Sequence, residues 1–423
     1  METSPGSPGS LPPTAADPTA DKALGGQDGA TGDVAAGATP VTIGIVAGEA
    51  SGDALAATLI RAVRARHPHV RFAGIAGPRM EAAGCDAWFP LEKLAVRGFV
   101  EVLAHLPELF RIRGELRRRL VAERVPVFVG VDAPDFNLGL ERKLKRAGLR
   151  TIHFVSPSVW AWRRERLKTI GRSVDRMLAL FPFEPPLYDT AGIPVTYVGH
   201  PLAQEAATHA TRRETRELLR LGAATPVFAL LPGSRISEIE MHAELVLETA
   251  ARLHDARNDA RFLVPFVTRA TRDAFEAAMH RTGHDRLPIT LLYGHAEDAL
   301  RAADVGVVAS GTATLEAALA RCPHVIFYRV SKLTEYLVRR RYLLPYVGLP
   351  NVLAGTFVVP EFLQEAATAR NLAQAALNLF DDTVTRRRLE ALFAGFASDL
   401  ATDTGGLAAA AVDAELARAG AAC

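Results

Sequence analysis

Short apolar runs alternate with longer amphipathic stretches along this chain, and the alternation begins twice. Runs such as TIGIVA at 42–47 and VFVGV at 127–131 have the length and the β-branched content of buried strands. A polar and charged stretch at about 205–225 interrupts the order, and strand-like runs then resume at 227. Repeated strand–helix–strand units build parallel sheets with helices on both faces. The sequence therefore predicts an α/β protein with two Rossmann-like halves, each a doubly wound parallel sheet.

The division of the chain follows from this pattern. We predict a tail at 1–40, a first domain at 41–205, a second domain at 206–360 and a group of helices at 361–423. The sequence leaves open whether these last helices pack back on the first domain. Strands are predicted at 42–47, 71–76, 127–131, 151–155, 177–180 and 195–198, then at 227–231, 262–265, 289–292, 305–309 and 325–328, with helices at 54–66 and 138–147.

Composition narrows the class of protein. With 423 residues the chain is long enough for two or three domains of about 150 residues each. Lys and Arg total 49 against 47 for Asp and Glu, so the net charge of +2 excludes a globally basic nucleic-acid binder. The three cysteines lack a CxxC spacing, which argues against a disulfide framework or zinc ribbon and favours a reducing compartment. No apolar run approaches the roughly 18 residues of a membrane-spanning helix.

The first 40 residues differ in composition from the rest of the chain. They consist mostly of Pro, Gly, Ser, Ala, Thr and Asp, with almost no large apolar side chains. Such a segment buries too little surface to offset the entropy of ordering, so we expect it to be disordered. It also lacks the basic and apolar regions of a secretory signal.

Ligands of open parallel sheets bind at the carboxyl ends of the strands, so the loops that follow strands are the candidate sites. The loop GEASGD at 48–53 offers Glu49, Ser51 and Gly52. Its glycines permit close approach of a ligand, but it is neither a GxGxxG fingerprint nor a Walker loop. The alternative is a tight turn in which Ser51 or Asp53 caps the following helix.

The loop GVDAPDFN at 130–137 places Asp132 directly after a buried strand. A second carboxylate, Asp135, stands three residues later. If the two lie close together, their repulsion can raise one pKa toward the range of a general base. In the alternative, Asp135 or Asn137 caps the next helix and Asp132 only turns the chain.

The loop SPSVWAWR at 156–163 holds two of the three tryptophans of the chain, Trp160 and Trp162, beside Arg163. Indole faces and guanidinium groups suit sugars, acyl chains or phosphates. The alternative is a core tryptophan followed by a solvated basic helix.

In the second half, the loop LPGSR at 231–235 follows a strand and precedes a helix expected near Ser237. Gly233 opens space, and Ser234 and Arg235 stand at the start of the helix, where free N–H groups and the helix dipole attract anions. Arg235 adds a guanidinium that can bind a phosphate through two parallel bonds. The alternative is a capped helix with a surface arginine.

The loop ASGTATLE at 309–316 has the same arrangement of strand, glycine turn and helix start. Hydroxyls of Ser310 and Thr312, with backbone N–H groups near Gly311, can cradle a phosphate. Glu316 follows one turn later, where it can accept from a ribose diol. The alternative is a Ser/Thr cap that Glu316 closes as a capping box.

Two such loops in one half predict a diphosphate ligand, as in a nucleoside diphosphate. Backbone and Arg235 supply the donors, the chain lacks a DxD pair suited to Mg²⁺, and the histidines show no tight ligand spacing. We therefore expect neither a metal nor a cofactor.

One stretch is typical of a helix at a membrane surface. Its apolar residues precede a row of arginines between 111 and 119, a combination that can lie among anionic headgroups. The alternative is a core-facing helix with a solvated basic side. The candidate membrane contacts are Val96, Phe99, Val100, Val102, Leu103 and Leu106.

Taken together and in order, these motifs resemble the lipid-A-disaccharide synthase family. The resemblance spans nearly all of 41–400 and leaves out the tail at 1–40. It rests on GEASGD (48–53), GPRMEAAGC (77–85), GVDAPDFN (130–137), HFVSPSVWAWR (153–163), GHPL (199–202), LLPGSR (230–235), ASGTATLE (309–316) and LPNVLAG (349–355).

The resemblance implies a GT-B glycosyltransferase, with two Rossmann-like domains and a cleft between them. The implied reaction is inverting: UDP-2,3-diacylglucosamine and 2,3-diacylglucosamine 1-phosphate give the β-1,6-linked disaccharide 1-phosphate of lipid A biosynthesis and UDP. It also implies a peripheral location at the cytoplasmic face of the inner membrane, contact of the 96–112 stretch with the bilayer, and a homodimer with exchanged C-terminal segments.

The resemblance also assigns roles to residues of this chain. Asp132 is the implied base and Glu49 orients the acceptor or the base, while Arg235 and the turn at 310–312 stabilise the leaving UDP. Asn351 contacts the nucleotide and Glu316 the ribose. The chain departs from the family pattern at 344–348, LPYVG, where a polar residue and a serine are expected, so a nucleotide contact from that loop stays open.

Two rival functions remain at this point. A non-hydrolysing UDP-N-acetylglucosamine 2-epimerase would share the architecture and a nucleotide cleft, but would not need an apolar stretch flanked by arginines. A nucleotide-binding, non-catalytic protein of the membrane surface is the second rival.

Overall fold

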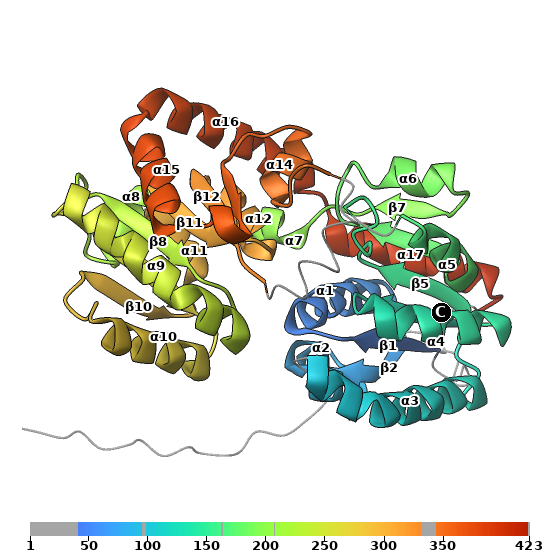
Figure 1. Cartoon of the computed structure of the whole chain (residues 1–423). Coiled ribbons are helices and arrows are strands. Elements are labelled where there is room, and N and C mark those ends of the chain that lie inside the picture. Colours follow the sequence, from blue (N-terminus) through green and yellow to red (C-terminus); the bar gives the residue numbers. More distant parts are fainter. Residues whose placement is uncertain (1–40, 95–98, 162–163, 207, 331–343, 422–423) are drawn as a thin grey trace, which may run out of the picture. The chain divides into compact units, whose positions relative to one another are not determined.

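The computed structural model describes residues 41–94, 99–161, 164–206, 208–330 and 344–421, with the backbone alone at 99–105. Residues 40–423 form one compact unit (Figure 1). The tail predicted to be disordered lies outside the described residues. Cys85 and Cys322 are buried free thiols, and Cys423 is not among the described residues.

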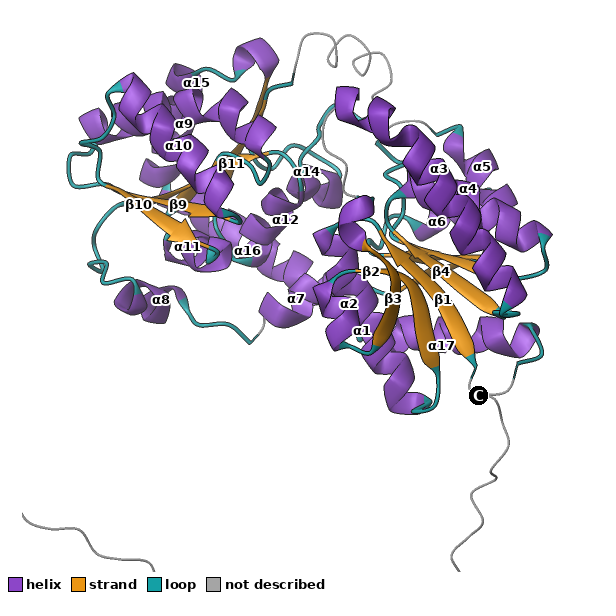
Figure 2. Ribbon diagram, turned by 90° about the horizontal axis from the view of Figure 1, so that it is seen from below, coloured by secondary structure: helices purple, strands orange, loops and turns teal. Residues whose placement is uncertain are grey.

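The first half is built on a seven-stranded sheet in which every pair of neighbouring strands is parallel (Figure 2). The strand order is β3-β2-β1-β4-β5-β6-β7, which contains the doubly wound order that the alternating pattern predicts. The strands are β1 Thr42–Ala47, β2 Arg71–Ala76, β3 Cys85–Pro90, β4 Val127–Val131, β5 Arg150–Phe154, β6 Arg176–Ala179 and β7 Val195–Tyr197.

Helices cover both faces of this sheet because its strands are apolar on both sides. On β4, Val127 and Val129 pack in a core with α1, whereas Phe128 points to the opposite core with α3 and α4. This placement explains why the VFVGV run has no polar residue. The helices are α1 Ala50–Arg66, α2 Pro78–Ala82, α3 Phe99–Ala122, α4 Pro134–Arg146, α5 Arg166–Ser173 and α6 Pro185–Thr190, with a short 3₁₀ helix at Leu91–Lys93.

The second half repeats the plan with six parallel strands in the order β10-β9-β8-β11-β12-β13. Large aromatics such as Phe228 and Phe262 fill one core and small residues such as Ala229 the other. The strands are β8 Val227–Leu231, β9 Arg261–Phe266, β10 Ile289–Tyr293, β11 Val305–Ala309, β12 His324–Tyr328 and β13 Glu361–Leu363.

The helices of the second half lie on both faces of its sheet (Figure 2). Helices α9, α10, α15 and α16 share one core with the sheet, and α11 and α12 share the other. The helices are α7 Pro201–Ala206, α8 Arg212–Leu218, α9 Ile236–Ala256, α10 Arg269–Thr282, α11 Ala296–Ala302, α12 Thr312–Leu319, α14 Leu349–Ala354, α15 Ala369–Asp381 and α16 Thr383–Leu400, with a 3₁₀ helix at Gln364–Ala366.

Every strand predicted from the sequence is present, and no end is off by more than one residue. The strands β3 and β13 were not predicted. The two predicted helices start too late in the sequence: α1 begins at Ala50 and α4 at Pro134. None of the helices within the described residues combines the length and apolar content that crossing a bilayer requires.

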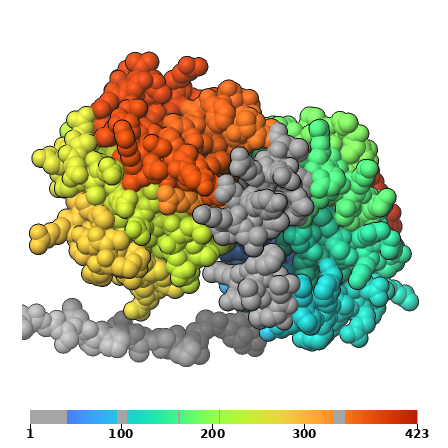
Figure 3. Space-filling view, in the orientation of Figure 1, coloured from blue at the N-terminus to red at the C-terminus, as the bar shows by residue number. Residues whose placement is uncertain are grey.

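The chain passes from one half to the other twice, and the two passages are bonded to each other. The N–H of His200 donates to the carbonyl of Leu400 at 3.0 Å, and the hydroxyl of Thr402 donates to the carbonyl of Val198. After the second passage, helix α17 (Thr404–Arg418) packs on α1 of the first half. It is the red helix beside the first half in Figure 1, and its red atoms are visible at the edge of the green region in Figure 3. The last helix therefore returns to the first sheet, whereas α15 and α16 stay on the second.

A buried carboxylate fixes α17 on this sheet. Glu415 is 0% exposed and lies within 3.0 Å of Arg150 and Arg176, which belong to β5 and β6. Arg418, one turn further along α17, contributes a third guanidinium at 2.6 Å. The carboxylate is thus paired from both sides, the condition under which a buried charge is tolerated.

We expect Glu415→Ala to reduce the free energy of unfolding by about 2–3 kcal/mol, because it removes the buried carboxylate that Arg150 and Arg176 share, and leaves Arg150 with Asp175 alone. The exposed pair of Arg66 with Asp413 on the same helix is the matched control, and Asp413→Ala should cost less than about 1 kcal/mol. Urea unfolding of the two variants measures the difference. Equal losses would show that Glu415 does not anchor α17.

Candidate functional site

The candidate loops lie where the winding of each sheet reverses. In the first sheet this point falls between β1 and β4, and in the second between β8 and β11. The loops GEASGD and GVDAPDFN follow β1 and β4, and the loops LPGSR and ASGTATLE follow β8 and β11. Since ligands of open α/β sheets bind at this reversal, four of the predicted loops occupy the favoured positions.

The two loops of the first sheet are packed directly against each other. A Cβ on Gly48 would lie 2.3 Å from the Cβ of Ala133, and one on Gly52 would lie 3.8 Å from the Cβ of Asp132. Only glycine at 48 allows this approach without displacing the Asp132 loop. Gly52 is buried, whereas Ser51 and Glu49 are exposed at the start of α1.

The alternative interpretation, in which Ser51 or Asp53 caps α1, is wrong. Glu49 is the N-cap residue, and neither Ser51 nor Asp53 binds the start of this helix. Asp53 is instead 3% exposed and accepts hydrogen bonds from the N–H groups of Gly77, Arg79 and Met80 at 3.0–3.1 Å. Asp53 therefore holds the start of α2, a long-range role that spacing along the chain does not reveal.

Asp132 lies at the end of β4 in an unusual backbone conformation. Its φ is +53° and that of Ala133 is +42°, a left-handed conformation that side chains with a Cβ rarely adopt. The amide of Asn137 donates to the carbonyl of Asp132 at 2.8 Å. Among the described residues, none forms a hydrogen bond or ion pair with the carboxylate of Asp132, so this group is available to a substrate.

Asp135 is separated from this arrangement. Its side chain is 87% exposed and pairs with Arg166 at 2.6 Å. The interpretation of Asp132 and Asp135 as a repelling pair is therefore not supported by the structure. The alternative cap is also wrong, because Ala133 is the N-cap of α4 and neither Asp135 nor Asn137 caps that helix.

In the second sheet, the first loop already binds a carboxylate. The N–H groups of Ser234 and Arg235 donate to Glu238 Oε2 at 2.9 and 3.2 Å. A Cβ on Gly233, whose φ is +133°, would lie 2.6 Å from the Cβ of Glu238. The N–H groups predicted to be free for a phosphate are thus occupied by Glu238, which the spacing of a capping box would have indicated.

Arg235 connects the two halves. Its guanidinium lies 3.2 Å from Glu238 and 3.5 Å from Glu49. Burial alone would lower the pKa of Arg235, but the carboxylates of Glu238 and Glu49 outweigh it and raise that pKa. Glu49 and Arg235 are therefore in contact, and the Glu49 loop itself packs against Asp132.

His242 is a further residue that the sequence did not suggest. It is fully buried on α9, and its Nδ1 lies 2.7 Å from the carbonyl of Pro232. Its Nε2 lies 3.2 Å from the backbone of Arg329, just after β12. His242 thus ties the loop after β8 to the loop after β12.

The loop after β11 has a different start to its helix. Ser310 donates its N–H to Phe327 at 2.8 Å, and Gly311, with φ +145°, is the N-cap of α12. No side chain among the described residues caps this helix, and Gly311 and Thr312 are exposed. The predicted capping box is therefore absent, and the start of α12 is open to an anion.

Glu316 is partly buried on the second turn of α12. Burial, and then the nearby carboxylate of Glu297, raises the pKa of Glu316. With Gly311 as the N-cap, the third residue of α12 is Thr314 and not Glu316, and the hydroxyl of Thr314 donates to the carbonyl of Gly311 at 2.8 Å.

The side chain of Asn351, the residue predicted to contact the nucleotide, is bonded within the protein. Asn351 is 0% exposed, and its amide donates to Val359 and Glu361 while its oxygen accepts from Val358 and Val359. All its hydrogen-bonding groups are used to fold the segment after α14. Glu361 also accepts from the N–H groups of Val347 and Gly348, so this carboxylate holds the loop that departs from the family pattern.

The SPSVWAWR loop is held by a buried glutamate. Glu184 is 1% exposed and accepts from the N–H groups of Leu180 and Phe181 and from the indole of Trp160 at 3.0–3.2 Å. Burial raises the pKa of Glu184 to about 7. Trp160 is thus a structural side chain in this loop, whereas Trp162 and Arg163 lie outside the described residues.

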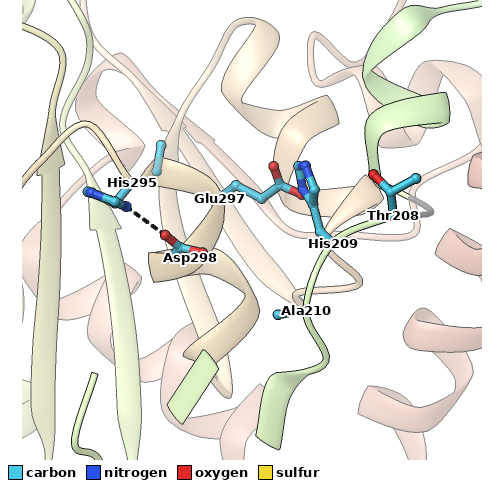
Figure 4. Close-up of a pocket in the computed structure, with 7 residues that line it drawn as sticks. Thr208, His209, Ala210, His295, Glu297 and Asp298 are labelled. Atoms are coloured by element: carbon cyan, nitrogen blue, oxygen red, sulfur yellow. Dashed lines mark hydrogen bonds and ion pairs between the residues drawn. The ribbon is translucent and has the colours of Figure 1, made fainter. Parts of the chain in front are cut away.

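A pocket of about 510 Å³ lies beside α11, at the carboxyl end of β10. Figure 4 shows His209 directed at Glu297, with which it forms an ion pair, and His295 bonded to Asp298. One residue of its lining, Glu297, is also a carboxylate that raises the pKa of Glu316 on α12. The described residues contain no group of three or more His, Cys, Asp or Glu placed to hold a metal.

The stretch predicted to contact a membrane is described only in part. Val96 lies outside the described residues, and the side chains of Phe99, Val100, Val102 and Leu103 on α3 are not described. Leu106 is partly buried. Further along α3, Ile112, Leu116 and Leu120 pack in the core, so the alternative of a core-facing helix holds for that part of α3.

Comparison with known proteins identifies the family. A family model described as lipid-A-disaccharide synthetase matches residues 43–398. A lipid-A-disaccharide synthase of Chromobacterium violaceum is 54% identical over 370 residues, 88% of this chain and 96% of the relative. One of Dechloromonas aromatica is 51% identical over 373 residues, 88% of this chain and 98% of the relative.

The chain belongs to the lipid-A-disaccharide synthetase family. It is therefore an enzyme, a glycosyltransferase, and the rival non-catalytic function is excluded.

The fold alone does not distinguish the lipid-A-disaccharide synthetase family from the other rival function, the UDP-N-acetylglucosamine 2-epimerase. The crystal structure of a UDP-GlcNAc 2-epimerase from Neisseria meningitidis bound to UDP-GlcNAc has a TM-score of 0.54 at 10% identity, covering 89% of this chain and 99% of that chain. This likeness supports the GT-B architecture with two parallel-sheet domains. The match to the synthetase family decides against the epimerase.

A buried acid with a raised pKa makes stability depend on pH. Because the pKa of Glu184 is about 7 in the folded protein, the native state holds its proton more tightly than the unfolded chain does. This contribution to stability is fully present below about pH 4.5 and is lost as the pH rises through about 7. Between pH 5 and 8 we expect the free energy of unfolding of Glu184→Gln to decrease less than that of the wild type, by up to about 3 kcal/mol.

Urea unfolding at several pH values measures this effect. At pH 5 the variant should be less stable than the wild type by about 1–3 kcal/mol, because the NH₂ group of the introduced glutamine would face N–H donors that need an acceptor. An unchanged pH slope in Glu184→Gln would contradict the assignment.

Proposed function

We propose that this chain joins UDP-2,3-diacylglucosamine to 2,3-diacylglucosamine 1-phosphate, giving the β-1,6-linked lipid A disaccharide 1-phosphate and UDP. The family match over 43–398 supports the reaction. The observation that carries the assignment of residues is the position of the four loops, two at each reversal of winding, with Glu49 of one half in contact with Arg235 of the other.

Asp132 is the general base of this reaction. Its carboxylate takes the proton of the acceptor 6-hydroxyl as that oxygen attacks the anomeric carbon and the bond to the diphosphate breaks. Attack opposite the leaving group inverts the configuration, as a β-linkage requires. The carboxylate has no bonding partner among the described residues, and it lies against the Glu49 loop, where Glu49 orients the acceptor.

The second half binds the UDP-sugar donor and stabilises the leaving diphosphate. The uncapped start of α12 offers its N–H groups and dipole to one phosphate, with Ser310, Gly311 and Thr312 around it. Arg235 neutralises the charge that develops on the departing UDP. Gly233 and Ser234 shape the approach to Arg235.

Glu316 accepts from the ribose, and the pocket beside Glu297 is of a size suited to part of a nucleoside. The fold neighbour that holds UDP-GlcNAc supports a UDP-sugar as donor.

Both substrates carry acyl chains, so the enzyme works at the inner-membrane surface, on its cytoplasmic side. The stretch at 96–106 is the membrane contact, and the neighbouring part of α3 has Phe110 58% exposed beside Arg111. The functional unit is a homodimer.

Two variants separate the base from the nucleotide site. Asp132→Asn should lower turnover about 10²–10⁴-fold and leave the affinity for UDP unchanged, since it removes only the proton acceptor. Arg235→Ala should weaken UDP binding about 10–100-fold, because it removes a charged donor. Product formation from the two acylated substrates and calorimetric titration with UDP measure the two effects. Turnover of Asp132→Asn near the wild-type level, or unchanged UDP affinity of Arg235→Ala, would remove that residue from its role.

Vesicle flotation tests the membrane contact. The wild type should float with vesicles containing about one third anionic phospholipid and remain behind with neutral ones, because arginines follow the apolar stretch. Phe110→Ser should reduce the floating fraction. Val384→Ser, which changes a 77% exposed apolar residue on α16, is the matched control and should float like the wild type. Equal flotation of all three proteins would argue against a contact through α3.

A further inference from the structure

A buried acid–imidazole pair lies behind the Asp132 loop. Glu141 of α4 and His153 of β5 are both 0% exposed, and His153 Nδ1 lies 2.7 Å from Glu141 Oε1. Burial raises the pKa of Glu141, and the neighbouring imidazole opposes this effect. A carboxyl group is almost never fully buried unless a partner compensates for the loss of water, so the pair is a specific feature of this site.

The Glu141–His153 pair packs closely against β4, the strand that precedes Asp132. Gly130 of β4 stands opposite His153 in the parallel pairing of β4 with β5. A Cβ on Gly130 would lie 2.2 Å from Glu141 Oε1 and 3.0 Å from the side chain of Asn137. The strand has a glycine at 130 because Glu141 fills the space that a side chain would need.

Asn137 connects this cluster to Asp132. It is fully buried, and its amide donates to the carbonyls of Asp132 at 2.8 Å and Val131 at 3.4 Å. The bond to Asp132 reaches the first of the two residues in the left-handed conformation, with φ +53° at Asp132 and +42° at Ala133, and the bond to Val131 reaches the residue before them. Such a conformation persists only where the surroundings enforce it.

The cluster is not optimised for stability alone. Asn137 Oδ1, Glu141 Oε2 and His153 Nε2 are buried without a hydrogen-bond partner among the described residues. Unpaired buried polar atoms destabilise a fold, and apolar side chains of similar size would avoid them. A polar cluster of this kind, directly behind a strained loop, points to a role in the site.

We infer that Asn137, Glu141 and His153 are positioning residues that hold the backbone of Asp132 in its left-handed conformation. This inference rests on the proposed function, in which Asp132 is the base. Glu141 and His153 fix each other, Glu141 and Asn137 both fill the space beside Gly130, and Asn137 binds the Asp132 carbonyl. None of the three touches the reacting atoms.

Kinetics of His153 variants test the inference. His153→Leu should lower kcat about 10–100-fold with both KM values within about threefold of the wild type, because a displaced base slows the chemical step and leaves substrate binding intact. His153→Asn should recover most of the lost kcat, since its Nδ2 can donate to Glu141 as the imidazole does. In the background of Asp132→Asn, His153→Leu should cause no further loss, because the two residues act through one group.

Asn137→Asp provides a second route if His153→Leu does not fold. It keeps the shape of the side chain but removes the donor to the Asp132 carbonyl, so the same selective loss of kcat is expected. The control is His324→Leu. His324 is a fully buried histidine at the start of β12, with Nδ1 2.8 Å from the carbonyl of Cys322, and its loss should lower stability without changing kcat.

The outcomes distinguish this inference from the proposed function. An active Asp132→Asn enzyme overturns both. An inactive Asp132→Asn enzyme, combined with wild-type kcat in His153→Leu or Asn137→Asp, overturns the positioning role alone. Equal losses in His153→Leu and His153→Asn, or a loss in His324→Leu as large as in His153→Leu, would also overturn it, since the effect would then follow stability rather than the bond to Glu141.

Discussion

The site depends on a property of doubly wound sheets: where the winding reverses, connections leave two neighbouring strands toward opposite faces. No crossover then covers the carboxyl ends of those strands, and the loops that follow them face open space. In this chain the reversal lies between β1 and β4 in one sheet and between β8 and β11 in the other. Asp132 and Arg235 both follow strands at these points, and Glu49 links them because its loop packs on the one and its carboxylate reaches the other.

Carboxylates that bind backbone N–H groups shape the loops around this site. Asp53 holds the start of α2, Glu184 the turn after β6, Glu238 the loop after β8 and Glu361 the segment before α14. Each replaces the water that the N–H groups would otherwise bind and so fixes a loop without a regular element. The start of α12 differs, because Gly311 supplies no side chain to cap it.

The sequence predicted the strands well because buried parallel strands are continuous apolar runs, as in VFVGV of β4. The strand β3 escaped prediction because CDAWFP mixes polar and apolar residues, and β13 has only three residues. Strand order cannot be obtained from such runs. The sequence therefore placed the loops at strand ends, but it did not show that they lie in pairs where the winding of each sheet reverses. The roles of Asp53 and Asn351 were missed for the same reason: their partners are set by folding, and both were polar residues in motifs that suggested a ligand.

The two glycine loops, which the proposed function places around the diphosphate, do not offer it equivalent contacts. At α9 the N–H groups of Ser234 and Arg235 bind Glu238, and two carboxylates stand beside a single guanidinium, so an arriving diphosphate meets like charge. At α12 it meets an uncapped helix start. The proposed function therefore gives the first phosphate contact to α12, and it requires Arg235 to exchange a carboxylate for the nucleotide.

Breaking the ion pair of Arg235 with Glu49 costs little free energy. The side chains of Arg235 and Glu49 are 51% and 55% exposed at a separation of 3.5 Å, and ion pairs as exposed as this contribute about 0–1 kcal/mol. A diphosphate carries more charge than one carboxylate and can accept both branches of the guanidinium. In the proposed reaction, Arg235 therefore pairs with Glu49 in the free enzyme and turns to the diphosphate when the donor binds, and Glu49 is then free to orient the acceptor.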